Sequence, residues 1–176
     1  MSLRAQQQKV DGIIWSETKL TWDDFKEDNT IEKYPGTFAK TFWKLHVTDP
    51  YTTMALLKKG ITVKVYALFI PSLSWTRKST IGKTSILAHE QLHFDIVELI
   101  ARELRKELSE ESVTANNYEK IIRKAKNKAL VKIHAIQNKY DDTHRTKWQK
   151  WVDDIHNGLA RLASYTSVDV FIALEN

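Results

Sequence analysis

The sequence of 176 residues contains no cysteine. This excludes disulfide bonds but says little about compartment, because a domain of this size can fold without them. Every apolar stretch is far shorter than the roughly 18 residues of a membrane span, so we expect no membrane-spanning segment. Internal repeats and low-complexity linkers are also missing. We therefore expect a single domain over residues 9–176, preceded by a cloning remnant and an N-terminal tail over residues 1–8.

The formal net charge of the chain is +5. Basic chains can bind nucleic acid or anionic surfaces. Here, however, the lysines between Glu119 and Lys132 alternate with apolar residues at helical spacing, which is typical of a solvated helix face. No recognition motif accompanies the charge, so we expect no nucleic-acid partner. Six tryptophans and 42% hydrophobic residues indicate an ordered, packed fold.

The first half of the sequence has the patterns of strands. Residues Phe38 to Val47 alternate, with lysine and histidine on one side, which predicts a half-buried strand. Ile61 to Ile70 is a long β-branched and aromatic run, which predicts a second strand. Thr21 to Asp24 predicts a cap and one short helical turn.

The apolar spacing becomes helical in the second half. We expect three helices, from Thr84 to Leu108, from Ala115 to Tyr140, and from Asp142 or Thr143 to Ala163. Tyr165 to Leu174 alternates weakly, and we expect a last strand there. The predicted class is α+β, with a short antiparallel sheet followed by three long helices.

The run His89-Glu90-Gln91-Leu92-His93 fits the H-E-x-x-H zinc motif and lies in the first predicted helix. Residues four apart lie one above the other on a helix, so both imidazoles can bind one metal ion. Glu90 projects toward the metal-activated water, whose pKa zinc lowers toward roughly 7. We therefore expect one zinc ion on His89 and His93, with Glu90 as the general base.

Two histidines leave a catalytic zinc ion one protein ligand short. We favour His144 as the third ligand, because it precedes Trp148 and Trp151 at helical spacing and so faces the core from a helix start. Alternatively, His144 is a core histidine capped by Asp141 or Asp142. The other candidates are histidines elsewhere and carboxylates on the first two helices, namely His46, His134, His156, Glu98, Glu103 and Glu119.

The run from Leu87 to Ile96 resembles the core motif of a bacterial family of proposed secreted zinc-dependent proteases, long classed as a domain of unknown function. Trp15-Ser16 and Leu20 to Phe25 are similar to the N-terminal signature of that family, and Ser74-Trp75 resembles an element ahead of its metal helix. A downstream motif, in which a histidine follows a Tyr-Asp pair, is similar to Gln137, Tyr140-Asp141, Thr143 and His144. The resemblance covers most of the chain.

This resemblance implies a small zincin-like domain with the metal motif on its first long helix. It also implies an exported protein, periplasmic or extracellular after removal of a signal peptide. It supports His144 as the third ligand and Asp141 as a supporting residue; Tyr140 is a candidate oxyanion donor or a helix-packing residue. Leu92 and Arg145 stand where the family usually has glycine, and Arg145 is placed to alter loop geometry or substrate preference.

We therefore expect a zinc metallopeptidase that acts on peptides or proteins. The alternative is a non-catalytic zinc- or peptide-binding module of zincin fold, against which the intact Glu90 argues. A basic surface-binding protein with an incidental motif is a third possibility, and zinc content separates it from the other two. Zincins align the substrate along an edge strand, for which Ile61 to Ile70 is the candidate. The sequence specifies neither the cleavage preference nor the oligomeric state.

Overall fold

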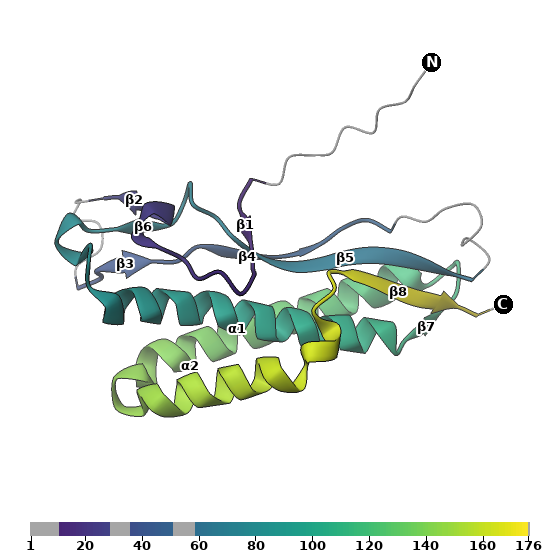
Figure 1. The fold of residues 1–176 in the computed structure, drawn as a ribbon. Coiled ribbons are helices and arrows are strands. Elements are labelled where there is room, and N and C mark those ends of the chain that lie inside the picture. The colour runs from purple at the N-terminus through teal and green to yellow at the C-terminus, as the bar shows by residue number, and fades with distance from the viewer. Residues whose placement is uncertain (1–10, 29–35, 51–58, 176) are drawn as a thin grey trace, which may run out of the picture.

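The computed structural model describes residues 11–28, 36–50 and 59–175, so the predicted remnant and tail over residues 1–8 lie outside the described residues. Two helices dominate the fold (Figure 1). Helix α1 (Thr84–Ser109) lies against one face of a sheet, and α2 (Tyr118–Arg161) lies beside α1 and bends back on itself. The predicted start of the first helix at Thr84 is confirmed.

The larger sheet is built around β5 (Gly60–Phe69), which confirms the strand predicted there. The antiparallel strands β4 (Trp43–Val47), β1 (Ile13–Ile14) and β8 (Asp169–Leu174) pair with it, and β7 (Ser112–Val113) runs parallel to β8. Ile70 N–H donates to Phe42 O toward β4, whereas Val65 N–H donates to Val168 O toward β8. Because alternate residues of a strand point their backbone groups to opposite edges, β4 and β8 lie on opposite edges of β5.

A smaller sheet precedes α1 in the sequence. Its central strand is β6 (Trp75–Thr76), which pairs parallel to β2 (Lys26–Glu27) and antiparallel to β3 (Ala39–Lys40). Short 3-10 turns lie at η1 (Trp22–Asp24), η3 (Lys78–Thr80) and η4 (Ala163–Tyr165), and η1 confirms the predicted helical turn. Since β3 and β4 follow each other closely, one extended segment runs from the smaller sheet into the larger one.

The main core lies between β5 and the two helices. Every second residue of β5 faces it, from Val63 through Val65 and Ala67 to Phe69, and all four are 0% exposed. They pack against a stripe of α1 and the first part of α2 that includes Val97, Leu104 and Ile133. Burying one such side chain stabilises the fold by about 1.5–3 kcal/mol, so this layer fixes α1 against the sheet.

Helix α2 changes direction at Lys147, whose φ of −129° and ψ of 24° are not helical. A second core cluster holds the two arms together. It consists of Leu92, Ile96, Tyr140, Ile155 and Leu159. Trp151 Nε1 also donates to Thr143 Oγ1 across the bend at 2.9 Å. Neither proline nor glycine stands at the bend.

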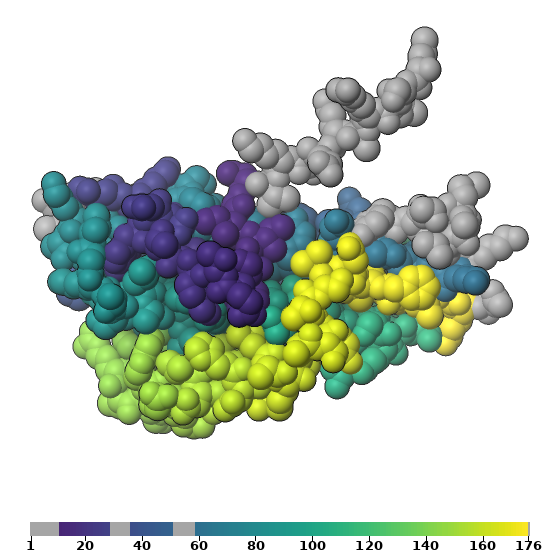
Figure 2. Space-filling view, viewed as in Figure 1, coloured from purple at the N-terminus to yellow at the C-terminus, as the bar shows by residue number. Residues whose placement is uncertain are grey.

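The N-terminal segment is tied to α1 by buried polar groups. Trp15 Nε1 donates to Asp95 Oδ1 at 2.7 Å, and the backbone N–H of Leu20 donates to Gln91 Oε1 at 2.8 Å. Gln91 Nε2 in turn donates to Asp95 Oδ1 at 2.8 Å. Figure 2 shows this segment, in purple, covering α1 on the face in view. The residues that resemble an N-terminal signature therefore hold this segment against α1 through buried hydrogen bonds.

The predicted fold class is wrong. The structure has two helices and strands in two mixed sheets, instead of a short antiparallel sheet followed by three long helices of a zincin-like domain. The expected second and third helices are the two arms of α2, which meet at Lys147 and not just after Tyr140, and β7 and β8 follow α1 and α2. The last strand, predicted within 165–174, is confirmed as β8. No helix in the described ranges is long and apolar enough to cross a membrane.

Candidate metal centre

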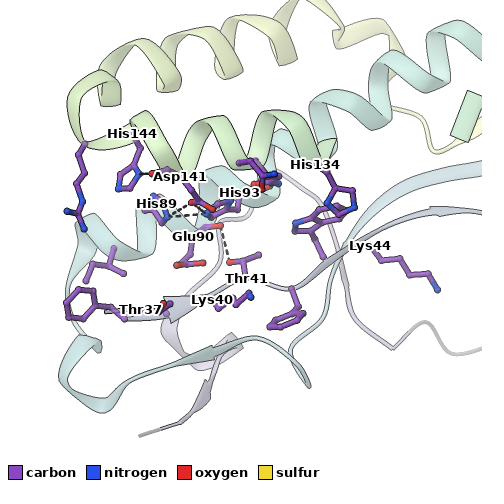
Figure 3. A pocket seen from close by; sticks show the side chains of 18 of the residues that line it. Thr37, Lys40, Thr41, Lys44, His89, Glu90, His93, His134, Asp141 and His144 are labelled. Atoms are coloured by element: carbon purple, nitrogen blue, oxygen red, sulfur yellow. Dashed lines mark hydrogen bonds and ion pairs between the residues drawn. The ribbon is translucent and has the colours of Figure 1, made fainter. Parts of the chain in front are cut away.

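Three side chains from the two helices converge on one point (Figure 3). His89 and His93 lie one turn apart on α1, and their Nε2 atoms are 3.0 Å apart. Asp141 projects from α2, with Oδ1 at 3.0 Å from His93 Nε2 and 3.5 Å from His89 Nε2. Among the residues that the structure describes, these three form the cluster able to hold a metal ion.

The separations fit a shared zinc ion. Ligand bonds of about 2.0–2.1 Å in a tetrahedral arrangement place the ligand atoms roughly 3.3–3.4 Å apart. The observed separations of 3.0 and 3.5 Å lie around this value. Two imidazoles and a carboxylate also form one of the donor sets that leave a fourth position for water. The residues present therefore fit a catalytic zinc site.

His93 is oriented by Gln137 of α2. Its Nδ1–H donates to Gln137 Oε1, while Gln137 Nε2 donates to the backbone carbonyl of His93 at 2.8 Å. The first of these bonds leaves the lone pair of Nε2 pointing at the cluster, as a metal ligand requires. His89 lacks such a partner: its Nδ1 is buried with no hydrogen bond among the described residues.

Electrostatic coupling holds the cluster together without metal. Burial alone would lower the pKa of His93, but the hydrogen bond that the protonated ring donates to Asp141 through Nε2, with the charges of Glu90 and Asp141, raises the pKa overall when no metal is bound. Burial alone would raise the pKa of Asp141, but hydrogen bonds to His89 and His93 hold that pKa well below its usual range. Asp141 is therefore ionised at neutral pH and ready to bind a cation.

Glu90 lies at the floor of the same site. Its side chain belongs to a residue only 4% exposed, and Oε2 is buried with no hydrogen-bond partner among the described residues. A buried carboxylate oxygen without a partner is costly and marks a place where a water or substrate group binds. The carboxylate and the ligand cluster line one cleft (Figure 3).

Tyr140 supports His89 from behind. Its ring is fully buried and stacks on the His89 ring with centroids 4.8 Å apart, and its hydroxyl donates to the backbone carbonyl of His89 at 3.3 Å. Burial, with the charge of Glu90, raises the pKa of Tyr140, so the hydroxyl keeps its proton. Because that proton is directed at the His89 carbonyl, we infer that Tyr140 packs the two helices together and does not bind an oxyanion.

His144 lies next to the cluster but outside it. Its Nδ1–H donates to the backbone carbonyl of Asp141 at 2.9 Å, and its ring centroid is 4.3 Å from that of His89. The structure thus brings Asp141, which the sequence suggested as a supporting residue, into the position expected for His144. The assignment of His144 as a ligand stays a prediction.

The remaining candidates lie outside the cluster, although His134 lines the same cleft. His46 stacks on Tyr66, His134 lies against Trp43, and His156 approaches Asp95 from the second arm of α2. The carboxylates have other partners: Glu98 pairs with Arg102 and Arg105, Glu103 with Lys132, and Glu119 with the Tyr118 hydroxyl. None of these groups belongs to the metal cluster found in the described part of the chain.

The cluster opens into a cleft of about 1290 Å³ between the helices and the extended segment of β3 and β4. β5 does not border it as a free edge, because β4 covers one side of β5 and β1 and β8 cover the other. The predicted role of residues 61–70 as the substrate edge strand is therefore wrong. Among the described strands, β4 pairs only with β5, so β4 is the edge strand that faces the cleft.

Sequence reasoning missed Gln137 and the direct part that Asp141 plays. A signal was available, because Gln137, Tyr140, Asp141 and His144 follow the spacing i, i+3, i+4 and i+7 and must share one helix face. Comparison with known proteins adds nothing to this assignment: no family model, no curated protein and no solved structure matches the chain.

Proposed function

We propose that this chain is a zinc-dependent hydrolase of peptide bonds. His89, His93 and Asp141 hold the ion, and Glu90 is the general base. The observation that carries the proposal is the convergence of three ligand atoms at 3.0 to 3.5 Å beside a buried carboxylate oxygen of Glu90 that has no hydrogen-bond partner in the described part of the chain. A site that only bound zinc would have no use for that carboxylate.

Zinc bound at this site would lower the pKa of a water toward about 7 and polarise the substrate carbonyl. Glu90 follows the first ligand directly in the helix, so its carboxylate lies beside the cluster without joining it. It accepts the proton that the water loses as its oxygen bonds to the peptide carbon. The same proton then passes to the leaving nitrogen as the carbon–nitrogen bond breaks.

The extended segment over residues 39–45 provides a surface for the peptide. Phe42 N–H donates to Ser74 Oγ and its carbonyl accepts from Ile70, so the backbone groups of Phe42 face away from the cleft. By the alternation of a strand, the peptide groups of Thr41, Trp43 and Leu45 face the cleft edge. A substrate in extended form can pair with them and pass its scissile bond across the metal cluster.

The test is to load the unaltered chain and Glu90→Gln with equal zinc and compare cleavage of a mixed peptide pool by mass spectrometry. Glu90→Gln keeps the shape and loses the basicity. Hydrolysis should fall roughly 10²-fold or more while zinc stays bound. Equal cleavage by both proteins would overturn the assignment of Glu90, and no cleavage by either would favour the zinc-binding module.

A further inference from the structure

The cleft carries an unbalanced set of charges. Four cationic side chains line it, Lys40, Lys44, Lys126 and Arg145, against two carboxylates, Glu90 and Asp141. Both carboxylates belong to the proposed metal centre, where a bound dication offsets them. Within the residues that the structure describes, none of the four cations forms an ion pair.

Some lysines on the outer surface of the helices do form ion pairs. Lys128 pairs with Glu107 at 3.0 Å, Lys132 with Glu103, and Lys150 with Asp154 at 2.9 Å. None of these three lysines lines the cleft. The cations that line the cleft have no such carboxylate among the described residues, and anionic groups of a ligand are their natural complement.

Two of the cations follow the strand alternation. Lys40 Nζ lies 5.2 Å from the centroid of the Phe42 ring, so both side chains project from one face of the extended segment. Lys44 continues that face, whereas Ala39, Thr41 and Leu45 are buried on the other. Lys40, Phe42 and Lys44 thus form a row of cation, aromatic ring and cation at every second residue. The side chains on one face of a peptide strand paired with this segment would have the same spacing.

Lys126 places a further cation close to one end of this row. It projects from α2, and both Lys44 and Lys126 act electrostatically on His46 of β4. Arg145 lies at the end of the cleft where α2 approaches its bend, next to His144. Cations from the extended segment and from α2 therefore both line the cleft.

We propose that the cleft selects acidic peptides whose carboxylates recur at alternate positions, with an apolar residue between them, in the pattern acidic-x-apolar-x-acidic. In an extended peptide paired with the 39–45 edge, those three side chains lie opposite Lys40, Phe42 and Lys44. The pattern is the same in either strand direction. This inference rests on the proposed function, since it takes the cleft above the metal centre as the substrate site.

The experiment measures binding to zinc-loaded Glu90→Gln, which cannot turn the peptides over. Four fluorescent nonapeptides differ only in their charge pattern. The first carries two glutamates, one on either side of a leucine, in the proposed spacing, and the second carries the same two glutamates at adjacent positions. The third and fourth are the first peptide with both glutamates replaced by lysine or by glutamine. Dissociation constants come from fluorescence anisotropy at low and high salt. The proposed peptide should bind roughly tenfold more tightly than the glutamine version, and salt should reduce the difference.

Matched variants locate the effect. Lys40→Glu with Lys44→Glu should abolish the preference for the proposed peptide and favour the lysine peptide. Lys124→Glu makes the same kind of charge change on an exposed part of α2 outside the cleft and should leave the order unchanged. Equal affinity for all four peptides, or an equal response to Lys124→Glu, would overturn the proposal. So would equal competition by a short single-stranded oligonucleotide, which would indicate a general polyanion site.

Cleavage by the unaltered chain separates this inference from the proposed function. If the peptides bind in the expected order but none is cut, the hydrolase assignment fails and the selectivity stands. If neutral and basic peptides are cut as fast as the acidic one, the selectivity fails and the hydrolase assignment stands.

Discussion

The choice between Asp141 and His144 decides the chemistry of the centre at the scale of single residues. Helical spacing places both on the face of α2 that meets α1, and the sequence therefore predicted the face correctly. It could not predict which side chain reaches the imidazoles, because that depends on rotamers and on the distance between the helices. His89, Glu90 and His93 needed no such information, since one helical turn places them together.

Separate replacement of the two side chains tests this choice. Asp141→Ala removes a charged ligand and should lower zinc affinity by more than the roughly 10–100-fold that is typical of losing a supporting residue. His144→Ala should stay within that range. Competition with a chromogenic chelator measures both constants, and Asp142→Ala, on the exposed neighbouring position, is the control. If His144→Ala lowered zinc affinity more than Asp141→Ala, His144 would be the ligand instead of Asp141.

The pKa of His46 responds to the positive charge of two residues that line the cleft. Burial, followed by the charges of Lys44 and Lys126, lowers its pKa below 6.5, although Asp49 opposes this and the ring stacks on Tyr66. The unfolded chain therefore binds more protons in the window just below pH 6.5. The stability that His46 contributes is complete above this window and is lost as pH falls through it.

We expect Lys44→Ala to raise the pKa of His46 toward its ordinary value, because one of the two repelling charges is gone. Titration of the imidazole Cε1–H resonance by NMR measures the shift directly. Lys124→Ala removes a charge from the same helix as Lys126 and should leave the resonance unchanged. A His46 that titrates above 6.5 in the unaltered chain would contradict this account of the cleft.

The elements were predicted unevenly. Periodicity gave α1 within one residue at its end and identified β5, β8 and the η1 turn. For α2 it predicted both arms but placed the break just after Tyr140 instead of at Lys147, where the sequence has neither proline nor glycine. Strand order also depends on contacts distant in sequence, which is why the edge strand was placed at residues 61–70 instead of β4.

Asp95 connects the N-terminal segment to α1, and replacing it tests how much these hydrogen bonds contribute to stability. The residue is 1% exposed and accepts hydrogen bonds from Trp15, Lys19 and Gln91. Asp95→Ala leaves these donors without their acceptor and should lower the free energy of unfolding by roughly 2–3 kcal/mol.

Urea unfolding of the metal-free proteins measures this loss. Asp153→Ala, which removes an exposed carboxylate bonded to Gln149, should change the free energy of unfolding by less than about 0.5 kcal/mol. A metal-free Asp95→Ala protein as stable as the unaltered chain would show that the segment contributes little to holding α1.

For the whole molecule, the proposed metal centre would link the two helices. Its ligands would come from α1 and from the first arm of α2, more than 40 residues apart in sequence, so ion binding would be coupled to folding. An ion present at 100 times its dissociation constant stabilises the folded chain by about 2.7 kcal/mol. The cationic cleft then lies on one side of the proposed centre, and the N-terminal segment bonded to α1 lies on the other.

The number of zinc ions per chain tests this account most directly. The full chain, Glu90→Gln and His89→Ala are each equilibrated with zinc, separated from free metal and analysed by mass spectrometry. We expect about one ion per chain in the first two and less than about a tenth of that in His89→Ala, which has lost a ligand. Equal zinc in His89→Ala, or none in the unaltered chain, would contradict the metal centre and the hydrolase built on it.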